Sequence, residues 1–202
     1  MNRIWRQLAS VAVIAALAAG CDRSPPARPP AEVTAVDVSG ESYPTDFTLT
    51  DHTGKIRKLS DFRGKIVALF FGYTQCPDVC PTTLSAFSEV LRILGPDADR
   101  VQVLFITVDP ERDTQQLLSE YIPAFDSRFV GLYGDMETTR RIAAGYHVTF
   151  EKIPTSSAGN YTMDHTAYVF FFDGKGRLWL KVPHGQSAQT VAALIREILN
   201  SP

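Results

Sequence analysis

Apolar residues from about Tyr43 onward recur in patterns that predict alternating strands and helices. Residues 66–71 form an unbroken apolar run, which is typical of a central strand covered on both faces. Between Leu84 and Leu94, apolar residues recur at helical spacing and stop before Gly95-Pro96, a sequence that terminates helices. A second apolar run covers residues 101–108. Together these elements predict a right-handed crossover unit with parallel strands.

Two hairpins are predicted on either side of this unit along the chain. Residues 47–59 centre on Asp51-His52-Thr53-Gly54, a turn sequence, so the domain is expected to start with a hairpin. Residues 167–182 centre on Asp173-Gly174-Lys175-Gly176 and are rich in aromatic and aliphatic residues, which again indicates a hairpin.

The rest of the folded part is predicted to hold three helices, one strand and a long loop. The helices are expected from Asp113 or Thr114 to Tyr121, over residues 136–144, and after a cap at Ser187, with the strand at residues 129–132. Residues 146–164 are rich in Gly, Ser, Thr and Asn and predict an irregular loop of about 19 residues. A loop of that length in a compact domain is more often functional than not.

The first 42 residues follow a different pattern. Arg3 and Arg6 precede an uncharged, mostly apolar run that ends at Gly20, which is typical of a secretory signal and shorter than the about 20 residues that a spanning helix needs. The sequence Leu17-Ala18-Ala19-Gly20-Cys21 resembles a bacterial lipoprotein signal, in which Cys21 would be acylated, although Ala18 stands where that pattern prefers leucine. The alternative is an ordinary cleavage site or an uncleaved anchor beside an incidental Cys21.

A tether is predicted after Cys21. Four prolines lie within Ser24–Pro30, a composition that favours extended polyproline and could reach about 60 Å over twenty residues. Asp22 resembles a signal that retains lipoproteins at the bacterial inner membrane. We therefore expect a signal peptide at residues 1–20, a tether at 21–42 and a folded domain at 43–202 that faces the periplasm.

Composition excludes several classes of protein. The 202 residues carry 20 basic and 22 acidic side chains, so there is no basic surface that would indicate a nucleic-acid partner. Three cysteines are too few for a disulfide scaffold and cannot all pair within one chain. The question becomes what the cysteines do in a domain that we expect to be monomeric.

The strongest local signal is the pair Cys76 and Cys80, within the sequence Gly72–Pro81 where the first central strand enters its helix. Ligand sites in open α/β sheets collect at such strand ends, and a helix N-terminus favours the thiolate form of cysteine. Cysteines four residues apart on one helical face could bind a single metal ion or, with backbone movement, form a disulfide. Because thioredoxin-type reductases have two intervening residues, the three found here favour metal.

Two sulfurs leave a metal undercoordinated, so a histidine is expected nearby. His52 lies in the predicted turn, whereas His147 and His184 lie in loop sequences; all three are more often plain surface residues. His165 lies between the predicted loop and the aromatic strand, near the sheet end that carries the cysteines. Its neighbour Asp164 could orient the imidazole.

Three motifs in the same order resemble the Sco (SenC) family of copper-binding, thioredoxin-fold proteins that help to assemble cytochrome c oxidase. They are Gly72–Leu84, Val108–Thr114 and Asp164–Thr166 before an aromatic strand. The resemblance implies an α/β thioredoxin-like fold with a central mixed sheet, and it makes Cys76, Cys80 and His165 the copper ligands. Residues 109–113 are interpreted as a turn and helix cap beneath a surface ion pair. Asp78 could tune the pKa of the thiols, mark a docking face or compensate the helix dipole.

The resemblance implies delivery of Cu(I) or Cu(II) to the binuclear copper centre of oxidase subunit II. Soft thiolates suit Cu(I), and an added imidazole also allows Cu(II); copper is preferred to zinc mainly on the family match. The alternative is a thiol-disulfide oxidoreductase that uses a reversible Cys76–Cys80 disulfide to keep that centre's cysteines reduced. A peroxidase-like reductase is a weaker option, since it needs no His165. A periplasmic copper donor or thiol reductant is the further expected partner.

Overall fold

The computed structural model describes residues 36, 38, 42–156 and 159–200. They form a seven-stranded sheet in the order β2-β1-β5-β4-β3-β8-β9 and a separate two-stranded sheet, β6-β7. Cys21, the predicted signal segment and most of the predicted tether lie outside the described residues, so those expectations stay predictions. Within the described ranges, no helix is long and apolar enough to cross a membrane.

The predicted crossover unit forms the centre of the larger sheet. Strand β3 (Ile66–Gly72) leads into helix α2 (Val79–Leu94), and β4 (Val101–Thr107) follows. The two strands pair in parallel along their whole length, and every residue of both is buried. Because the strands are covered on both faces, their sequences are continuous apolar runs and do not alternate.

Both predicted hairpins are present and make the sheet mixed. The first is β1 (Thr48–Asp51) with β2 (Ile56–Lys58), and the second is β8 (Tyr168–Phe172) with β9 (Leu178–Pro183). Strand β8 runs antiparallel to β3, on the side opposite β4. The predicted thioredoxin-like mixed sheet is therefore confirmed.

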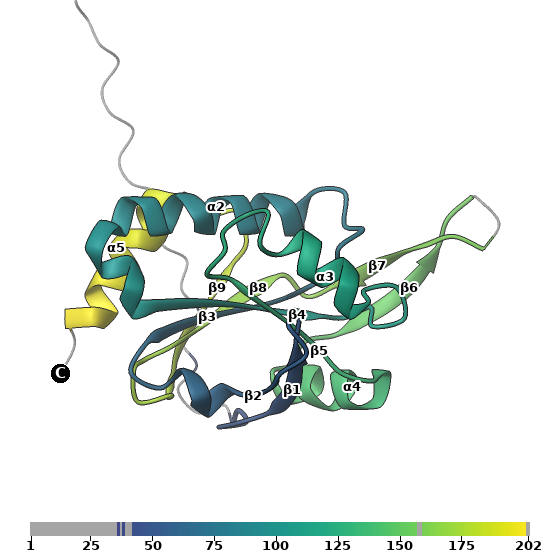
Figure 1. The fold of residues 1–202 in the computed structure, drawn as a ribbon, viewed down its shortest axis with the longest axis horizontal. Coiled ribbons are helices and arrows are strands. Elements are labelled where there is room, and N and C mark those ends of the chain that lie inside the picture. Colours follow the sequence, from purple (N-terminus) through teal and green to yellow (C-terminus); the bar gives the residue numbers. More distant parts are fainter. Residues whose placement is uncertain (1–35, 37, 39–41, 157–158, 201–202) are drawn as a thin grey trace, which may run out of the picture. The chain divides into compact units, whose positions relative to one another are not determined.

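Helices cover both faces of this sheet, with α2 and α5 on one face and α4 on the other (Figure 1). The remaining elements are η1 (Leu59–Phe62), η2 (Gly95–Arg100), α3 (Gln115–Tyr121), β5 (Val130–Tyr133), α4 (Met136–Gly145) and α5 (Ala188–Asn200). Thr114, and not Asp113, caps α3, because its side chain accepts a hydrogen bond from the amide of Leu117.

The expected irregular loop at residues 146–164 is wrong for about half of its length, because residues 150–154 and 161–164 lie in strands. Strand β6 (Phe150–Pro154) pairs antiparallel with β7 (Tyr161–His165), in a register that sets Phe150 opposite His165. Four of the five residues of β6 are exposed. With polar residues on both faces there is no alternating apolar pattern from which a strand could be predicted. This hairpin, drawn in green in Figure 1, extends beyond the main sheet.

Candidate metal centre

The cysteine-bearing loop begins where β3 ends, at a position that only glycine fits. A Cβ added to Gly72 would lie 2.7 Å from the ring of Phe105 and 2.9 Å from Sγ of Cys80. The loop is then fixed by Asp113, which is 1% exposed. Its carboxylate accepts hydrogen bonds from the amide and hydroxyl of Thr74, at 3.0 and 2.6 Å, and from the hydroxyl of Thr107 at 2.6 Å. Asp113 thus joins the loop to the end of β4.

The two cysteines do not share a helical face, contrary to the expectation from their spacing. Cys80 lies in the first turn of α2 and is fully buried, whereas Cys76 lies in the loop before the helix and is partly exposed. The sulfurs converge because the loop turns back over the helix start, where the amide of Cys80 donates to Sγ of Cys76 at 3.4 Å. Free amides at a helix N-terminus favour negative charge, so this end of α2 stabilises a thiolate.

The pKa values of the two thiols are shifted in opposite directions. A hydrogen bond from Cys80, helped by the backbone amides of Asp78 and Cys80 and by His165, outweighs burial and lowers the pKa of Cys76 well below its usual range, to about 5. The same hydrogen bond and burial raise the pKa of Cys80. At neutral pH the reduced pair therefore carries a thiolate on Cys76 and a thiol on Cys80.

His165 reaches the cysteines from the end of β7. Its Nε2 lies 3.6 Å from Sγ of Cys80. The ring packs edge-to-face against Tyr73 and Phe70, with centroids 5.8 and 6.2 Å away. The hydroxyl of Tyr73 in turn lies 2.8 Å from that of Thr162 on β7. The aromatic rings thus hold the imidazole against the end of β3.

The backbone carbonyl of Thr166 orients the imidazole, and not Asp164 as expected. Nδ1 of His165 lies 3.2 Å from this oxygen. Because a carbonyl oxygen only accepts hydrogen bonds, Nδ1 is the donor, and a neutral imidazole then presents its lone pair at Nε2, which faces the cysteines. The side chain of Asp164 is exposed on β7. A backbone acceptor cannot be recognised from residue type, which is why the sequence did not indicate it.

Cys76, Cys80 and His165 together form a set of donor atoms suited to one soft metal ion. One ligand atom from each residue lies within 4.8 Å of the others, a separation that an ion with bonds of about 2.0–2.3 Å could span after small side-chain movements. Two sulfurs and one imidazole nitrogen match soft and borderline ions such as copper and zinc. In the part of the chain that the structure describes, this is the only group of three or more such side chains with converging donors.

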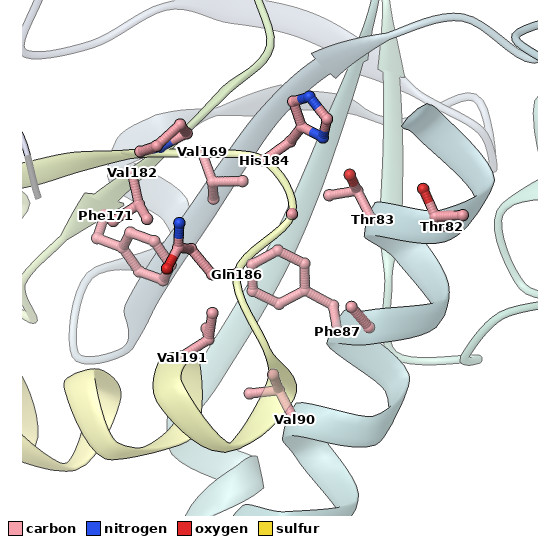
Figure 2. Close-up of a pocket in the computed structure, with 13 residues that line it drawn as sticks. Thr82, Thr83, Phe87, Val90, Val169, Phe171, Val182, His184, Gln186 and Val191 are labelled. Atoms are coloured by element: carbon pink, nitrogen blue, oxygen red, sulfur yellow. The ribbon is translucent and has the colours of Figure 1, made fainter. Parts of the chain in front are cut away.

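The other three histidines lie elsewhere. His52 is half-buried, and its Nδ1 accepts a hydrogen bond from the amide of Gly131 at 3.1 Å, so it links the first hairpin to β5 instead of being a solvated turn residue. His147 is exposed, with its ring against Tyr43. His184 lies on the wall of an apolar cavity of about 230 Å³ between α2, β9 and α5 (Figure 2). No thiol or carboxylate lines that cavity, so it offers no second metal donor.

The segment between Asp109 and Asp113 is more than the expected turn beneath a surface ion pair. Asp109 is fully buried and accepts hydrogen bonds from Nε of Arg112 and from the hydroxyl of Tyr161. Nη1 of Arg112 donates to the side chain of Gln75 at 3.2 Å and to the carbonyl of Tyr161 at 2.8 Å. These side chains join the cysteine loop to the β6–β7 hairpin. The sequence indicated the cysteine loop and residues 109–113 as separate motifs, but not their contact with each other or with the hairpin.

Asp78 stands at the start of α2, where its charge is placed to compensate the helix dipole. The residue is exposed at the N-cap position of α2, and its carboxylate makes no capping hydrogen bond. Its backbone amide, however, donates to Cys76 and helps to lower the pKa of that thiol.

A thioredoxin-like sheet with two cysteines and one histidine converging at a strand end defines a class of thiol-bearing α/β proteins equipped to bind a soft metal ion. The SCO1/SenC family profile matches residues 37–200. The chain belongs to the SCO1/SenC family. It is 37% identical over 153 residues to the mitochondrial SCO2 homolog of Bos taurus, an alignment that covers 75% of this chain and 58% of that protein.

Solved structures agree with this assignment. The copper-bound structure of Bradyrhizobium japonicum ScoI is similar with a TM-score of 0.70 and 42% sequence identity, and the match covers 76% of this chain and 97% of ScoI. BsSco, described as a member of the Sco family of cytochrome c oxidase assembly proteins with a disulfide switch, has a TM-score of 0.60 at 19% identity, covering 80% of this chain and 96% of BsSco. That second likeness shows the fold alone. The chain spans about half to two thirds of the length of the curated relatives it matches.

Proposed function

We propose that this protein is a copper metallochaperone that binds one copper ion through Cys76, Cys80 and His165 and delivers it to the binuclear copper centre of cytochrome c oxidase subunit II. The observation that carries the proposal is the convergence of two sulfurs and Nε2 of His165 within 4.8 Å. The copper-bound ScoI structure, at 42% identity, supports copper as the ion. Oxidase assembly as the setting rests on the chain's membership of the SCO1/SenC family.

The donor set suits transfer better than storage. Thiolates stabilise Cu(I), and the imidazole allows the site to hold Cu(II) as well. Three protein ligands leave a position open, whereas a structural metal site is closed by four. Cys76 is partly exposed, so a ligand of the receiving protein could reach the ion from that side and displace the chaperone's own ligands.

Copper titration of single variants tests the ligand assignment. Wild-type protein with Cu(II) should show a thiolate-to-copper charge-transfer band that is lost in Cys76→Ser and Cys80→Ser, and His165→Ala should lose tight binding and oxidase assembly. His184→Ala is the matched control, because this exposed histidine lines the apolar cavity, to which none of the three proposed ligands contributes. It should leave copper binding and oxidase assembly unchanged. Full copper binding and oxidase assembly in His165→Ala would overturn the assignment and the chaperone function together.

The second candidate is reduction of the oxidase centre's disulfide, favoured by the lowered pKa of about 5 at Cys76. The Cys76 thiolate would attack one sulfur of the target disulfide and release the other as a thiolate. Cys80, once deprotonated, would attack Cys76 and release the second target sulfur. The target gains two electrons, and the protein is left with a Cys76–Cys80 disulfide that a periplasmic thiol reductant must reduce. If His165→Ala loses both copper binding and oxidase assembly while its reduction of subunit II is unchanged, the reductase activity is secondary.

The proposed setting is the periplasmic side of a bacterial inner membrane, with the protein held as a monomer by a lipid on Cys21. The supporting features are the signal-like residues 1–20 and the proline-rich segment after Cys21. A periplasmic copper donor would load the site.

A further inference from the structure

Three segments that are distant in the sequence meet beside the candidate metal centre. They are the cysteine loop, the segment after β4, and the β6–β7 hairpin that carries His165. The hairpin forms its own two-stranded sheet and has no strand pairing with the main sheet among the described residues. Its position relative to the cysteines therefore depends on side-chain contacts and on the short link from His165 to β8.

Arg112 makes the most direct connection between the three segments. Its guanidinium donates to Asp109 on its own segment, to Gln75 of the cysteine loop and to the backbone carbonyl of Tyr161 at the start of β7. The same group lies 3.6 Å from the centroid of the Tyr161 ring. A planar group with several donors can satisfy these partners at once, whereas an ammonium cannot.

Asp109 contacts both Arg112 and Tyr161 and so completes the connection. It is fully buried, with one carboxylate oxygen accepting from Arg112 and the other from the Tyr161 hydroxyl at 2.8 Å. Nη2 of Arg112 is buried with no hydrogen-bond partner among the described residues. Burying an unpaired donor costs free energy, so the Asp109–Arg112 ion pair adds little to the stability of the fold. Its contacts with Tyr161 are better suited to holding the hairpin in position.

We infer that Asp109, Arg112 and Tyr161 form a clamp that sets the position of His165 relative to Cys76 and Cys80, and so governs Cu(II) binding more strongly than Cu(I) binding. The inference rests on the proposed copper-binding function. His165 lies four residues beyond Tyr161 on the same strand, so a shift at Tyr161 moves the imidazole. Cu(I) is held well by two thiolates, whereas Cu(II) depends more on the imidazole nitrogen. Loosening the clamp should therefore lower the affinity for Cu(II) more than the affinity for Cu(I).

The test compares Arg112→Met with a matched control, Arg100→Met. Arg100 on η2 pairs with Asp97 at 3.4 Å, and both side chains are exposed. Arg112→Met should weaken Cu(II) binding by about 10- to 100-fold, as loss of supporting contacts does in metal sites, and should shift the thiolate-to-Cu(II) band. Its Cu(I) affinity in a chelator competition, and both affinities of Arg100→Met, should stay within about threefold of wild type. Arg112→Lys should resemble Arg112→Met.

A measurement on metal-free protein separates failure of the clamp from failure of the copper function. Hydrogen exchange of the β6–β7 amides should be about tenfold faster in Arg112→Met, with β3 and β4 unchanged. If Arg112→Met does not fold, Tyr161→Phe serves instead, since it keeps the ring and loses only the hydroxyl given to Asp109. Wild-type protein that binds no copper would end the proposed function, while the exchange rates would still decide the clamp. Unchanged exchange, or equal losses of Cu(I) and Cu(II) affinity, would overturn the clamp.

Discussion

Cys76 and Cys80 differ in chemistry because the chain gives them different surroundings four residues apart. Cys76 lies before the helix, partly exposed, and receives hydrogen bonds from the amides of Asp78 and Cys80. Cys80 lies inside the first turn of α2, where burial disfavours its charged form. One sulfur is thus ready to attack or to bind a metal, while the other keeps its proton until a metal or a disulfide exchange removes it.

The lowered pKa of Cys76 predicts its alkylation behaviour. In reduced, metal-free protein the thiolate fraction rises with pH through the folded pKa of about 5, so the rate with iodoacetamide should level off above about pH 6, well below an ordinary thiol's midpoint near 8.5. Peptide mass mapping should place the label on Cys76 and leave Cys80 unlabelled. Cys80→Ala removes the hydrogen-bond donor, so the midpoint should move upward. A midpoint near 8.5 in wild-type protein would contradict the assigned thiolate.

At the scale of elements, the buried strands and the hairpin differ in how well the sequence predicts them. Strands β3 and β4 are covered on both faces, so their unbroken apolar runs indicated them within one residue. Strand β6 is mostly exposed, β7 is largely half-buried, and the two hold together through backbone pairing with each other. Backbone pairing leaves no mark on residue type, so an irregular loop was predicted where the hairpin lies.

Asp113 shows how a single buried side chain holds the cysteine loop to β4. Asp113→Ala leaves the Thr74 amide and the hydroxyls of Thr74 and Thr107 without their acceptor, which should lower the free energy of unfolding by about 3 kcal/mol. Asp113→Asn retains one acceptor oxygen and should cost less. Urea unfolding of both variants measures this. The control is Asp97→Ala, whose ion pair with Arg100 is exposed and should change stability by less than about 0.5 kcal/mol. Equal effects at positions 113 and 97 would contradict the anchoring role.

At the scale of the molecule, the site joins chain segments that only the fold brings together. The contacts of His165 with Cys80 and of Arg112 with Tyr161 link residues 85 and 49 positions apart. The sequence motifs and their resemblance to a family indicated which residues to expect near one another. The connecting role of Asp109 and Arg112 depends on how the hairpin folds back over the segment after β4. Since the hairpin itself was not predicted, its contacts could not be either.

The proposed division into anchor, tether and domain predicts that membrane attachment and copper binding are separable. If Cys21 is acylated, its chains hold the protein at the bilayer through about 0.8 kcal/mol per buried CH₂, and Cys21→Ser should release it from the membrane fraction. None of the proposed copper ligands lies within residues 1–42, so the purified variant should keep the wild-type copper spectrum. Ser24→Ala is the neighbouring control and should stay attached. The mass of the wild-type N-terminal peptide should show the acyl groups directly. A Cys21→Ser protein that remains in the membrane fraction would favour an uncleaved anchor over acylation.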